Sequence, residues 1–285
     1  MHDMNYGKLY IVATPIGNLG DITFRAIEIL KSVDIIAAED TRRTKELLNH
    51  FEIKNLCISF NEHTDREKIN GFIEKIKAGE NVAIVSDAGT PLISDPGHIL
   101  VSLAVENDIE VISIPGACAA INALVQSGIS CKTFRFVGFL SEDNKERKKQ
   151  LDKILDETDT SIIYISSHNL KKDLKALIDV LGEDRYASLS REMTKKYEET
   201  VRGSLSYIST YFDKENIKGE FVLILKGIDE EEKREKEINL WLKMSVEEHL
   251  NYYLNQGMDE KSAMKKVASD RGKSKSDIYK VLKVK

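Results

Sequence analysis

Apolar and amphipathic segments alternate along residues 9–114. The segments between the apolar runs carry apolar residues three or four positions apart, which is the spacing of helices with one buried face. Buried strands are predicted at 9–13, 33–38, 56–60, 82–85 and 110–114, and helices at 23–32, 44–50, 66–78 and 99–106. This alternation predicts a mostly parallel sheet whose strands are connected by crossover helices.

Polar and glycine-rich residues follow each predicted strand, at 14–20, 39–41, 61–64, 85–97 and 115–116. Open α/β sheets bind ligands at the carboxyl ends of their strands, so we expect these loops to border one crevice. The 85–97 loop, Val-Ser-Asp-Ala-Gly-Thr-Pro-Leu-Ile-Ser-Asp-Pro-Gly, is too long to be a simple turn.

The rest of the chain predicts a second α/β unit and a helical tail. Strands are expected at 161–165, 186–189 and 220–225 around a helix at 170–181, in a mixed sheet. Ser245 followed by Glu248 has the form of a capping box, which marks the start of a helix in the tail. The predicted domains are 1–118, 119–228, a charged linker at 229–240, and a helical domain at 241–285.

Composition favours a globular protein without metal or disulfides. The 285 residues are 41% hydrophobic and 31% charged, with a formal net charge of −5. Three dispersed cysteines match no zinc pattern and are typical of reduced thiols, and no apolar run approaches membrane-spanning length. We therefore expect a cytoplasmic protein that binds no membrane, and any nucleic-acid site must be a local basic patch.

The tail offers such a patch. Residues 241–285 hold ten Lys and Arg against six Asp and Glu, an excess of four positive charges, and Lys273 and Lys275 are its candidate RNA contacts. A solvated helical cap or a dimerisation element explains the tail equally well.

Two strand-end motifs contain candidate chemistry. Glu39-Asp-Thr-Arg-Arg43 is interpreted either as a capped first helical turn with ion pairs or as a phosphate-binding site made by Arg42 and Arg43. His63 is interpreted either as a surface residue or as part of the site. The sequence has no Gly-x-Gly-x-x-Gly, Walker A or Gly-x-Ser-x-Gly motif, which disfavours nicotinamide, P-loop and α/β-hydrolase chemistry.

Taken in order, these motifs resemble those of the tetrapyrrole-methylase superfamily and, more narrowly, of its branch that methylates small-subunit ribosomal RNA. The matching segments are Thr14-Pro-Ile-Gly-Asn-Leu-Gly-Asp-Ile-Thr23, Ala38-Glu-Asp-Thr-Arg42, Ser59-Phe-Asn-Glu-His63, the 85–97 loop, Ile114-Pro-Gly-Ala117, Phe136-Val-Gly-Phe-Leu140, Ser190-Arg-Glu-Met-Thr-Lys195 and Gly219-Glu220. The tail also resembles the C-terminal domain of that branch, so the resemblance covers nearly the whole chain.

The resemblance implies two α/β domains with S-adenosylmethionine in a cleft between them, in a homodimer. It implies methylation of the ribose 2′-hydroxyl of a cytidine in the 16S ribosomal RNA decoding region, within the small ribosomal subunit. The implied cofactor-binding residues are Pro15, Asp87, Ala88, Gly89, Thr90, Ile93, Cys118, Ala119, Ile165, Ser166 and Ala187. Ile165, Ser167 and Asn169 depart from the Tyr-Glu-Ser-Pro-His-Arg of the branch, and Cys118 replaces a serine.

Methyl transfer to a ribose hydroxyl is an in-line displacement at carbon that needs no metal. Because the hydroxyl is a weak nucleophile, a nearby proton acceptor helps, and the candidates are Asp40, Glu39 and His63. Two alternatives stay open. One is a methylase of the same fold that acts on a tetrapyrrole or another small molecule, and the other is an RNA-binding protein without activity.

Overall fold

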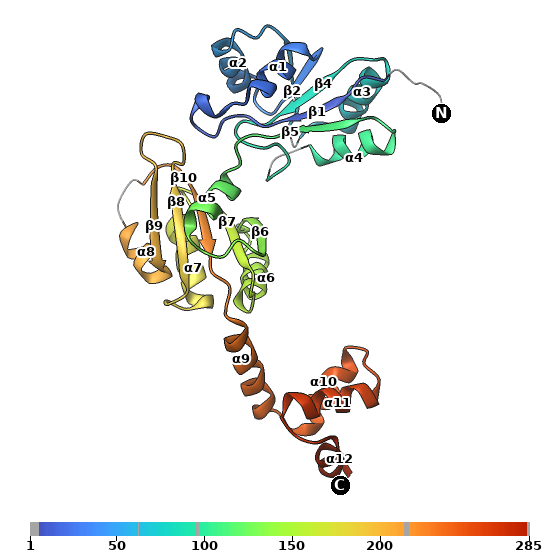
Figure 1. Cartoon of the computed structure of the whole chain (residues 1–285), viewed down its shortest axis with the longest axis vertical. Coiled ribbons are helices and arrows are strands. Elements are labelled where there is room, and N and C mark those ends of the chain that lie inside the picture. The colour runs from blue at the N-terminus through green and yellow to red at the C-terminus, as the bar shows by residue number, and fades with distance from the viewer. Residues whose placement is uncertain (1–5, 62, 95–96, 214–216, 284–285) are drawn as a thin grey trace. The chain divides into compact units, whose positions relative to one another are not determined.

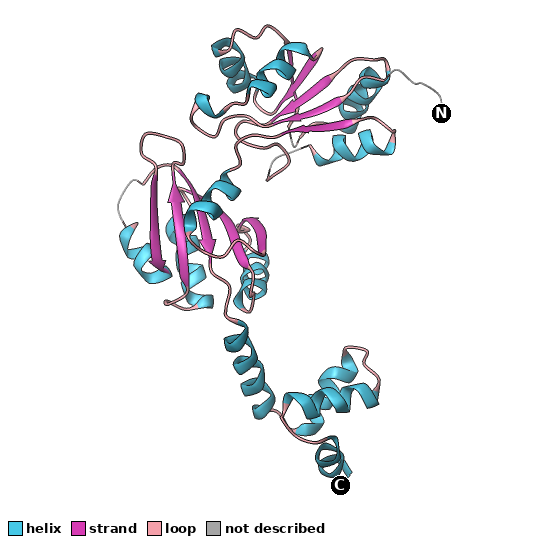
Figure 2. Cartoon of the chain, viewed as in Figure 1, coloured by secondary structure: helices cyan, strands magenta, loops and turns pink. Residues whose placement is uncertain are grey.

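The computed structural model describes residues 6–61, 63–94, 97–213 and 217–283. Residues 62, 95 and 96, which belong to two of the predicted strand-end loops, lie outside this range. The larger of two compact units comprises 1–155 and 160–226, and the smaller comprises 156–159 and 227–285. Figure 2 shows strands only in the larger unit and helices in both.

The first sheet of the larger unit is parallel, as predicted, with strand order β3-β2-β4-β1-β5. Its strands are β1 (Leu9–Val12), β2 (Ile35–Ala38), β3 (Leu56–Ser59), β4 (Val82–Val85) and β5 (Val111–Ile114), and its helices are α1 (Phe24–Ser32), α2 (Thr41–His50), α3 (Arg66–Lys77) and α4 (His98–Glu106), with a short 3-10 turn, η1 (Leu19–Asp21) (Figure 1).

Burial on both faces explains why the inner strands β1, β2 and β4 are continuously apolar. Successive side chains of a strand point to opposite faces. Accordingly, Ile35 and Ala37 pack with α3 and α4, whereas Ile36 and Ala38 pack with α1 and α2. When helices cover both faces of a parallel sheet, a ligand can bind at the carboxyl ends of its strands.

The second sheet is mixed, with strand order β6-β7-β10-β8-β9, and only β6 and β7 run parallel. Its strands are β6 (Phe134–Phe139), β7 (Thr160–Ser166), β8 (Tyr186–Arg191), β9 (Glu199–Ser204) and β10 (Glu220–Leu225). Its helices are α5 (Ala119–Ser127), α6 (Asn144–Leu155), α7 (Leu170–Leu181) and α8 (Leu205–Tyr211).

Alternation along β7 and β10 again builds two cores. Ile163 and Leu223 point toward α6, α7 and α8, whereas Ile162 and Val222 point toward α5. The α5 core also includes Ile16, from the loop that follows β1. Ile16 therefore docks that loop of the first sheet directly on the second sheet.

The smaller unit is a helical bundle of α9 (Glu230–Lys243), α10 (Val246–Asn255), α11 (Glu260–Asp270) and α12 (Lys275–Lys283). The predicted capping box is confirmed: Ser245 Oγ accepts the Glu248 N–H at 3.1 Å, and Glu248 Oε2 accepts the Ser245 N–H at 2.8 Å. The segment 229–240, predicted as a charged linker, lies mostly within helix α9.

A guanidinium group holds the bundle together. Arg271 donates to the carbonyl oxygens of Trp241, Met244 and Ser245 at 2.7–2.9 Å and to His249 Nδ1 at 3.1 Å. The Trp241 indole stacks on the His249 imidazole with 4.0 Å between ring centroids. Burial and the neighbouring Arg271 charge lower the pKa of His249, so this stacked ring is neutral at physiological pH.

No helix in the described part of the chain is both long and apolar enough to cross a bilayer.

Candidate active site

The larger unit contains a cavity of about 300 Å³ at the carboxyl ends of the first-sheet strands. Loops of the first sheet, the start of α5 and strands of the second sheet line it together. Its lining residues are Ile16, Glu39, Arg43, Asp87, Ala88, Gly89, Thr90, Ile93, Ser94, Cys118, Ala119, Phe139, Tyr164, Ile165, Ser166, Glu192, Met193, Lys195, Glu220, Phe221 and Val222.

Backbone hydrogen bonds fix the floor of the cavity at residues 86–90. Gly89 and Thr14 form an isolated antiparallel bridge, with N···O distances of 2.8 and 3.0 Å. The Thr90 hydroxyl donates to the Ala117 carbonyl at 3.1 Å, which connects this loop to the segment before α5. Three loops that are distant in the sequence are therefore held side by side.

The start of α5 forms a second wall. Cys118 occupies the N-cap position without a side-chain capping bond, and the Ala120 N–H donates to the Tyr164 hydroxyl at 3.2 Å. The partial positive charge of a helix N-terminus favours an anionic group, such as the carboxylate of a small ligand.

Acidic groups outnumber basic groups around the cavity. The carboxylates are those of Glu39, Asp87, Glu192 and Glu220, and the cations are Arg43 and Lys195. Arg43 Nη1 lies 3.2 Å from Asp87 Oδ2, and the Asp40 N–H donates to Asp87 Oδ1 at 3.0 Å. This surplus of negative charge favours a ligand with positive charge.

Asp40 lies beside the cavity rather than in its lining. Its carboxylate caps α2 through the Arg42 N–H at 2.8 Å and pairs with the Arg42 guanidinium at 3.0 Å. These hydrogen bonds from the Arg42 side chain and backbone lower the pKa of Asp40, which weakens it as a proton acceptor. The geometry matches the interpretation as a capped helical turn.

Most of the predicted cofactor residues meet in this cavity. Those that line it are Asp87, Ala88, Gly89, Thr90, Ile93, Cys118, Ala119, Ile165 and Ser166. Pro15 is not part of the lining, and its neighbour Ile16 is. Ala187 has no exposed surface because it packs in the core under α7 and α8. Among the predicted catalytic residues, Glu39 lines the cavity and His63 does not.

Several lining residues were not predicted, among them Ile16, Glu192, Met193, Lys195 and Glu220. The signal was present, because the motifs at 190–195 and 219–220 contain four of them. The pairing of β10 with β8 aligns Phe221 with Arg191. This pairing brings the two motifs together at the cavity, although they are distant in the sequence.

Residues 8–208 match the sequence pattern of the Tetrapyrrole (Corrin/Porphyrin) Methylases. The chain belongs to this methylase family. Methylases of the family use S-adenosylmethionine as the methyl donor. The fold predicted from the sequence, two α/β domains of tetrapyrrole-methylase type and a helical C-terminal region, is thereby confirmed.

Close relatives within the family share a single name. The chain is 45% identical over 273 residues to "Ribosomal RNA small subunit methyltransferase I" of Bacillus subtilis, covering 96% of this chain and 93% of the relative. The protein of the same name from Halalkalibacterium halodurans is 46% identical over 275 residues, covering 96% and 94%.

Solved methylases share the fold at much lower identity. A uroporphyrin-III-C-methyltransferase from Thermus thermophilus has a TM-score of 0.54 and 16% identity, covering 77% of this chain and 94% of its own. A diphthine synthase has a TM-score of 0.59 and 14% identity, covering 80% and 94%.

The cavity of this methylase fits S-adenosylmethionine. Ile16, Met193 and Val222 provide an apolar surface for an adenine ring, and the carboxylates favour the ammonium and sulfonium charges. The lack of a side chain at Gly89 lets the floor pack closely against Ile16, since a Cβ there would lie 3.1 Å from Ile16 Cγ2. The bound donor supplies a methyl carbon attached to positively charged sulfur. The described residues hold no cluster of three or more His, Cys, Asp or Glu side chains for a metal.

Proposed function

We propose that this protein is an S-adenosylmethionine-dependent ribosomal RNA methyltransferase that methylates the ribose 2′-hydroxyl of a cytidine in the decoding region of 16S ribosomal RNA. The observation that carries the proposal is 45% identity along 96% of the chain to a relative named for methylation of small-subunit ribosomal RNA. The composition of the cavity agrees with it, because the lining suits a cationic methyl donor.

The residues of this chain contribute mainly by positioning. The 86–90 loop and the start of α5 would hold the donor, so that its methyl carbon meets the ribose oxygen in line. Holding two reactants in such a geometry can contribute about 7–11 kcal/mol to lowering a reaction barrier. The methyl-transfer chemistry needs little more than orientation and a destination for the hydroxyl proton.

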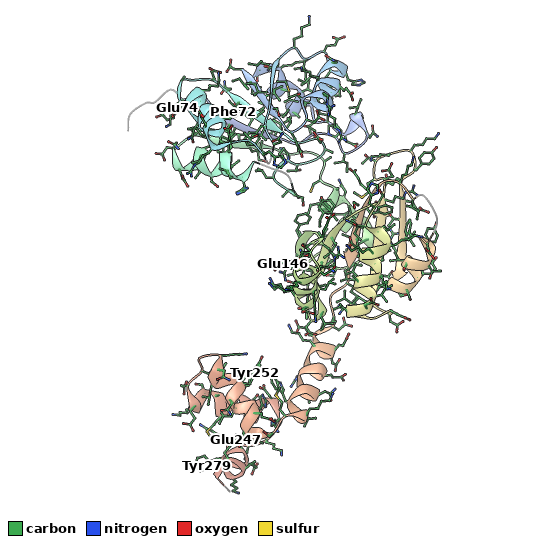
Figure 3. All side chains as sticks on the ribbon, turned by 180° about the vertical axis from the view of Figure 1, so that it is seen from behind. Phe72, Glu74, Glu146, Glu247, Tyr252 and Tyr279 are labelled. Atoms are coloured by element: carbon green, nitrogen blue, oxygen red, sulfur yellow. The ribbon has the colours of Figure 1, made fainter. Side chains whose placement is uncertain are left out.

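We propose that the helical bundle holds the RNA. Lys275, Lys261 and Tyr279 surround a surface hollow between α11 and α12, and Tyr279, labelled in Figure 3, is 47% exposed. Lysine ammonium groups suit phosphates, and an exposed aromatic ring suits a stacked base. Arg42 and Arg43 are the corresponding candidates near the cavity, although each pairs with an aspartate.

Replacing Lys273 and Lys275 together with glutamine should weaken binding of 16S ribosomal RNA and leave S-adenosylmethionine affinity unchanged. Each lost phosphate contact should reduce the slope of log affinity against log salt concentration by about 0.7–0.9. Filter binding across a salt series measures this slope. Lys75→Gln, which removes an exposed lysine from α3, serves as the control. An unchanged slope in the double variant excludes these lysines from RNA binding.

We further propose that the protein acts as a homodimer on the small ribosomal subunit, in the cytoplasm where subunits are assembled. Light scattering of the purified chain measures its mass in solution. A monomer mass at micromolar concentration contradicts the dimer without affecting the proposed activity.

One experiment tests the proposed function directly. Small ribosomal subunits that lack the modification are incubated with the protein and labelled S-adenosylmethionine, and the methylated ribose is mapped on 16S ribosomal RNA. Labelling of a base or of another subunit overturns the proposed position. If calorimetry detects no S-adenosylmethionine binding, the protein is an RNA-binding protein without activity. Since the solved tetrapyrrole enzyme shares only 16% identity, its likeness shows fold and not substrate.

A further inference from the structure

The turn between β8 and β9 has an unusual backbone conformation beside the cavity. Glu192 and Thr194 both have positive φ, at 51° and 65°, a region that residues other than glycine rarely occupy. The buried Thr194 hydroxyl oxygen has no hydrogen-bond partner among the residues that the structure describes. Strained backbone of this kind is concentrated at functional sites, so the turn calls for a functional explanation.

Local hydrogen bonds maintain this turn. The Lys195 N–H donates to the Glu192 carbonyl at 3.0 Å, and the Thr194 N–H donates to Glu198 Oε2 at 2.8 Å. The result is that Glu192 and Lys195, three residues apart, both present their side chains to the cavity.

Two glycines leave space for these side chains. A Cβ on Gly219 would lie 2.8 Å from Cγ and Oε1 of Glu192, and a Cβ on Gly17 would lie 2.5 Å from Cγ of Lys195. A side chain at either glycine would displace the glutamate or the lysine. Gly17 belongs to the loop after β1 of the first sheet, so the Lys195 side chain packs against that loop.

The Glu192 carboxylate is held by one oxygen. Its Oε1 accepts from Lys195 Nζ at 3.0 Å and from the Glu220 N–H at 3.4 Å. No partner of its Oε2 is found among the described residues, although the side chain is only 20% exposed. Burial would lower the pKa of Lys195, but the hydrogen bond to Glu192 and the charges of Glu220 and Glu192 outweigh it and raise this pKa. Lys195 therefore stays charged.

The other carboxylates of the cavity are less suited to accept a proton. Glu39 already accepts the Asp87 N–H through Oε2 at 3.3 Å and has a further interaction. Both oxygens of Asp87 are engaged, one by the Asp40 N–H and one by Arg43. The Glu220 side chain is 81% exposed, so water competes for it. A carboxylate with one anchored oxygen and one available oxygen is the arrangement expected of an oriented general base.

We infer that Glu192 is the proton acceptor of the methyl transfer and that Lys195 is the positioning residue that orients its carboxylate. This inference rests on the proposed function. In the step, an electron pair of the ribose 2′-oxygen forms the new O–C bond, and the C–S bond breaks with its electron pair staying on sulfur. The hydroxyl proton passes to Glu192 and later to water.

Glu192→Gln tests the acceptor. The rate of a single turnover on unmodified small ribosomal subunits should fall about 10²–10⁴-fold. The dissociation constant of S-adenosylmethionine, measured by calorimetry, should rise by no more than about tenfold, because the amide keeps the shape of the side chain and the other three carboxylates of the cavity keep their charge. Glu146→Gln is the control, since Glu146 (Figure 3) forms the same i,i+3 pair with Lys149 at 2.7 Å but does not line the cavity.

Chemical rescue of Glu192→Ala distinguishes a proton acceptor from a residue that only supports the structure. Removing the side chain opens space beside Gly219, and added formate should restore methyl transfer in this variant and not in Glu192→Gln. Lys195→Met should slow the single turnover about tenfold. The Glu192 carboxylate would still accept a proton in this variant, but Lys195 would no longer orient it.

Three results overturn the inference: wild-type-like turnover by Glu192→Gln, a loss of turnover matched by an equal loss of S-adenosylmethionine affinity, or no rescue of Glu192→Ala by formate. If Glu192→Gln fails to fold, formate rescue and Lys195→Met decide. If the wild-type protein methylates no ribose in the same assay, the proposed function fails instead.

Discussion

Gly89→Ala is expected to lower the affinity for S-adenosylmethionine at least tenfold, equivalent to about 1.4 kcal/mol. Gly89 has a φ of +83°, which L side chains rarely adopt. An added Cβ would lie 3.1 Å from Ile16 Cγ2 and 3.5 Å from the Ala117 carbonyl oxygen. The substitution therefore forces a shift where the 86–90 loop, the loop after β1 and the segment before α5 meet.

Gly182→Ala separates steric contact from backbone strain. Gly182 follows α7 with a φ of +91°, and a Cβ there meets nothing within 4 Å. Both variants should lose about 1–2 kcal/mol of stability from the positive φ. Calorimetry should show weaker S-adenosylmethionine binding only for Gly89→Ala. Equal affinities in the two variants would falsify the role of this loop as the cofactor floor.

Arg147→Met should destabilise the protein by about 3–5 kcal/mol, as expected when one partner of a buried ion pair is lost. Arg147 on α6 and Asp173 on α7 have side chains only 6% and 4% exposed, with 3.6 Å between Nη2 and Oδ1. Without the guanidinium, the Asp173 carboxylate is left buried in the unit whose apolar core includes Leu151 and Leu174. Chemical denaturation measures the loss.

The same variant has a predictable dependence on pH. Burial already raises the pKa of Asp173, although the Arg147 charge opposes the shift. Without Arg147 the folded-state pKa rises further, so the folded protein holds a proton that the unfolded chain has released. Stability of Arg147→Met should therefore increase as pH falls from this raised pKa toward the ordinary carboxyl pKa, and it should decrease as pH rises from the ordinary value through the raised one.

Removing both charges is the control for the buried pair. The double variant Arg147→Met with Asp173→Leu should recover most of the lost stability, because apolar side chains of similar volume replace a buried pair at little cost. A double variant as unstable as Arg147→Met would show that packing of the Arg147 stem, and not the unpaired charge, causes the loss.

The first sheet could be predicted almost completely from the sequence. Its inner strands are buried on both faces, so each is a continuous apolar run such as Val82–Val85, and each run ends at a glycine-rich or polar loop. Beside the second sheet, the predicted helix at 170–181 is confirmed as α7. The local pattern of apolar residues is sufficient to predict a helix or strand when one of its faces is fully buried.

Strands β6 and β9 and helix α6 were not predicted, for identifiable reasons. β6 lies at the sheet edge and shifts its register between Phe136 and Gly138, which breaks the two-residue period. β9 is the other edge strand and is mostly polar. α6 buries only Arg147, Leu151 and Ile154 within a highly charged sequence. Elements whose apolar period is broken, or whose sequence is mostly polar or charged, are therefore missed.

In the candidate site, too, some residues were predicted from the sequence and others were not. Gly89, Thr90, Cys118 and Ala119 were predicted from the family resemblance. Their position soon after first-sheet strands agrees with it, because parallel strands bring such segments together.

The order of elements in the first sheet, the loops at the cavity and the charge of the tail could be predicted from the amino-acid sequence, since these follow from neighbours along the chain. The sequence did not show that Glu192 and Lys195 enter the cavity, that Arg43 pairs with Asp87, or that Ala187 is buried in the core. These features became visible only in the fold, because the direction and partner of a side chain depend on strand pairing and packing between residues far apart in the chain.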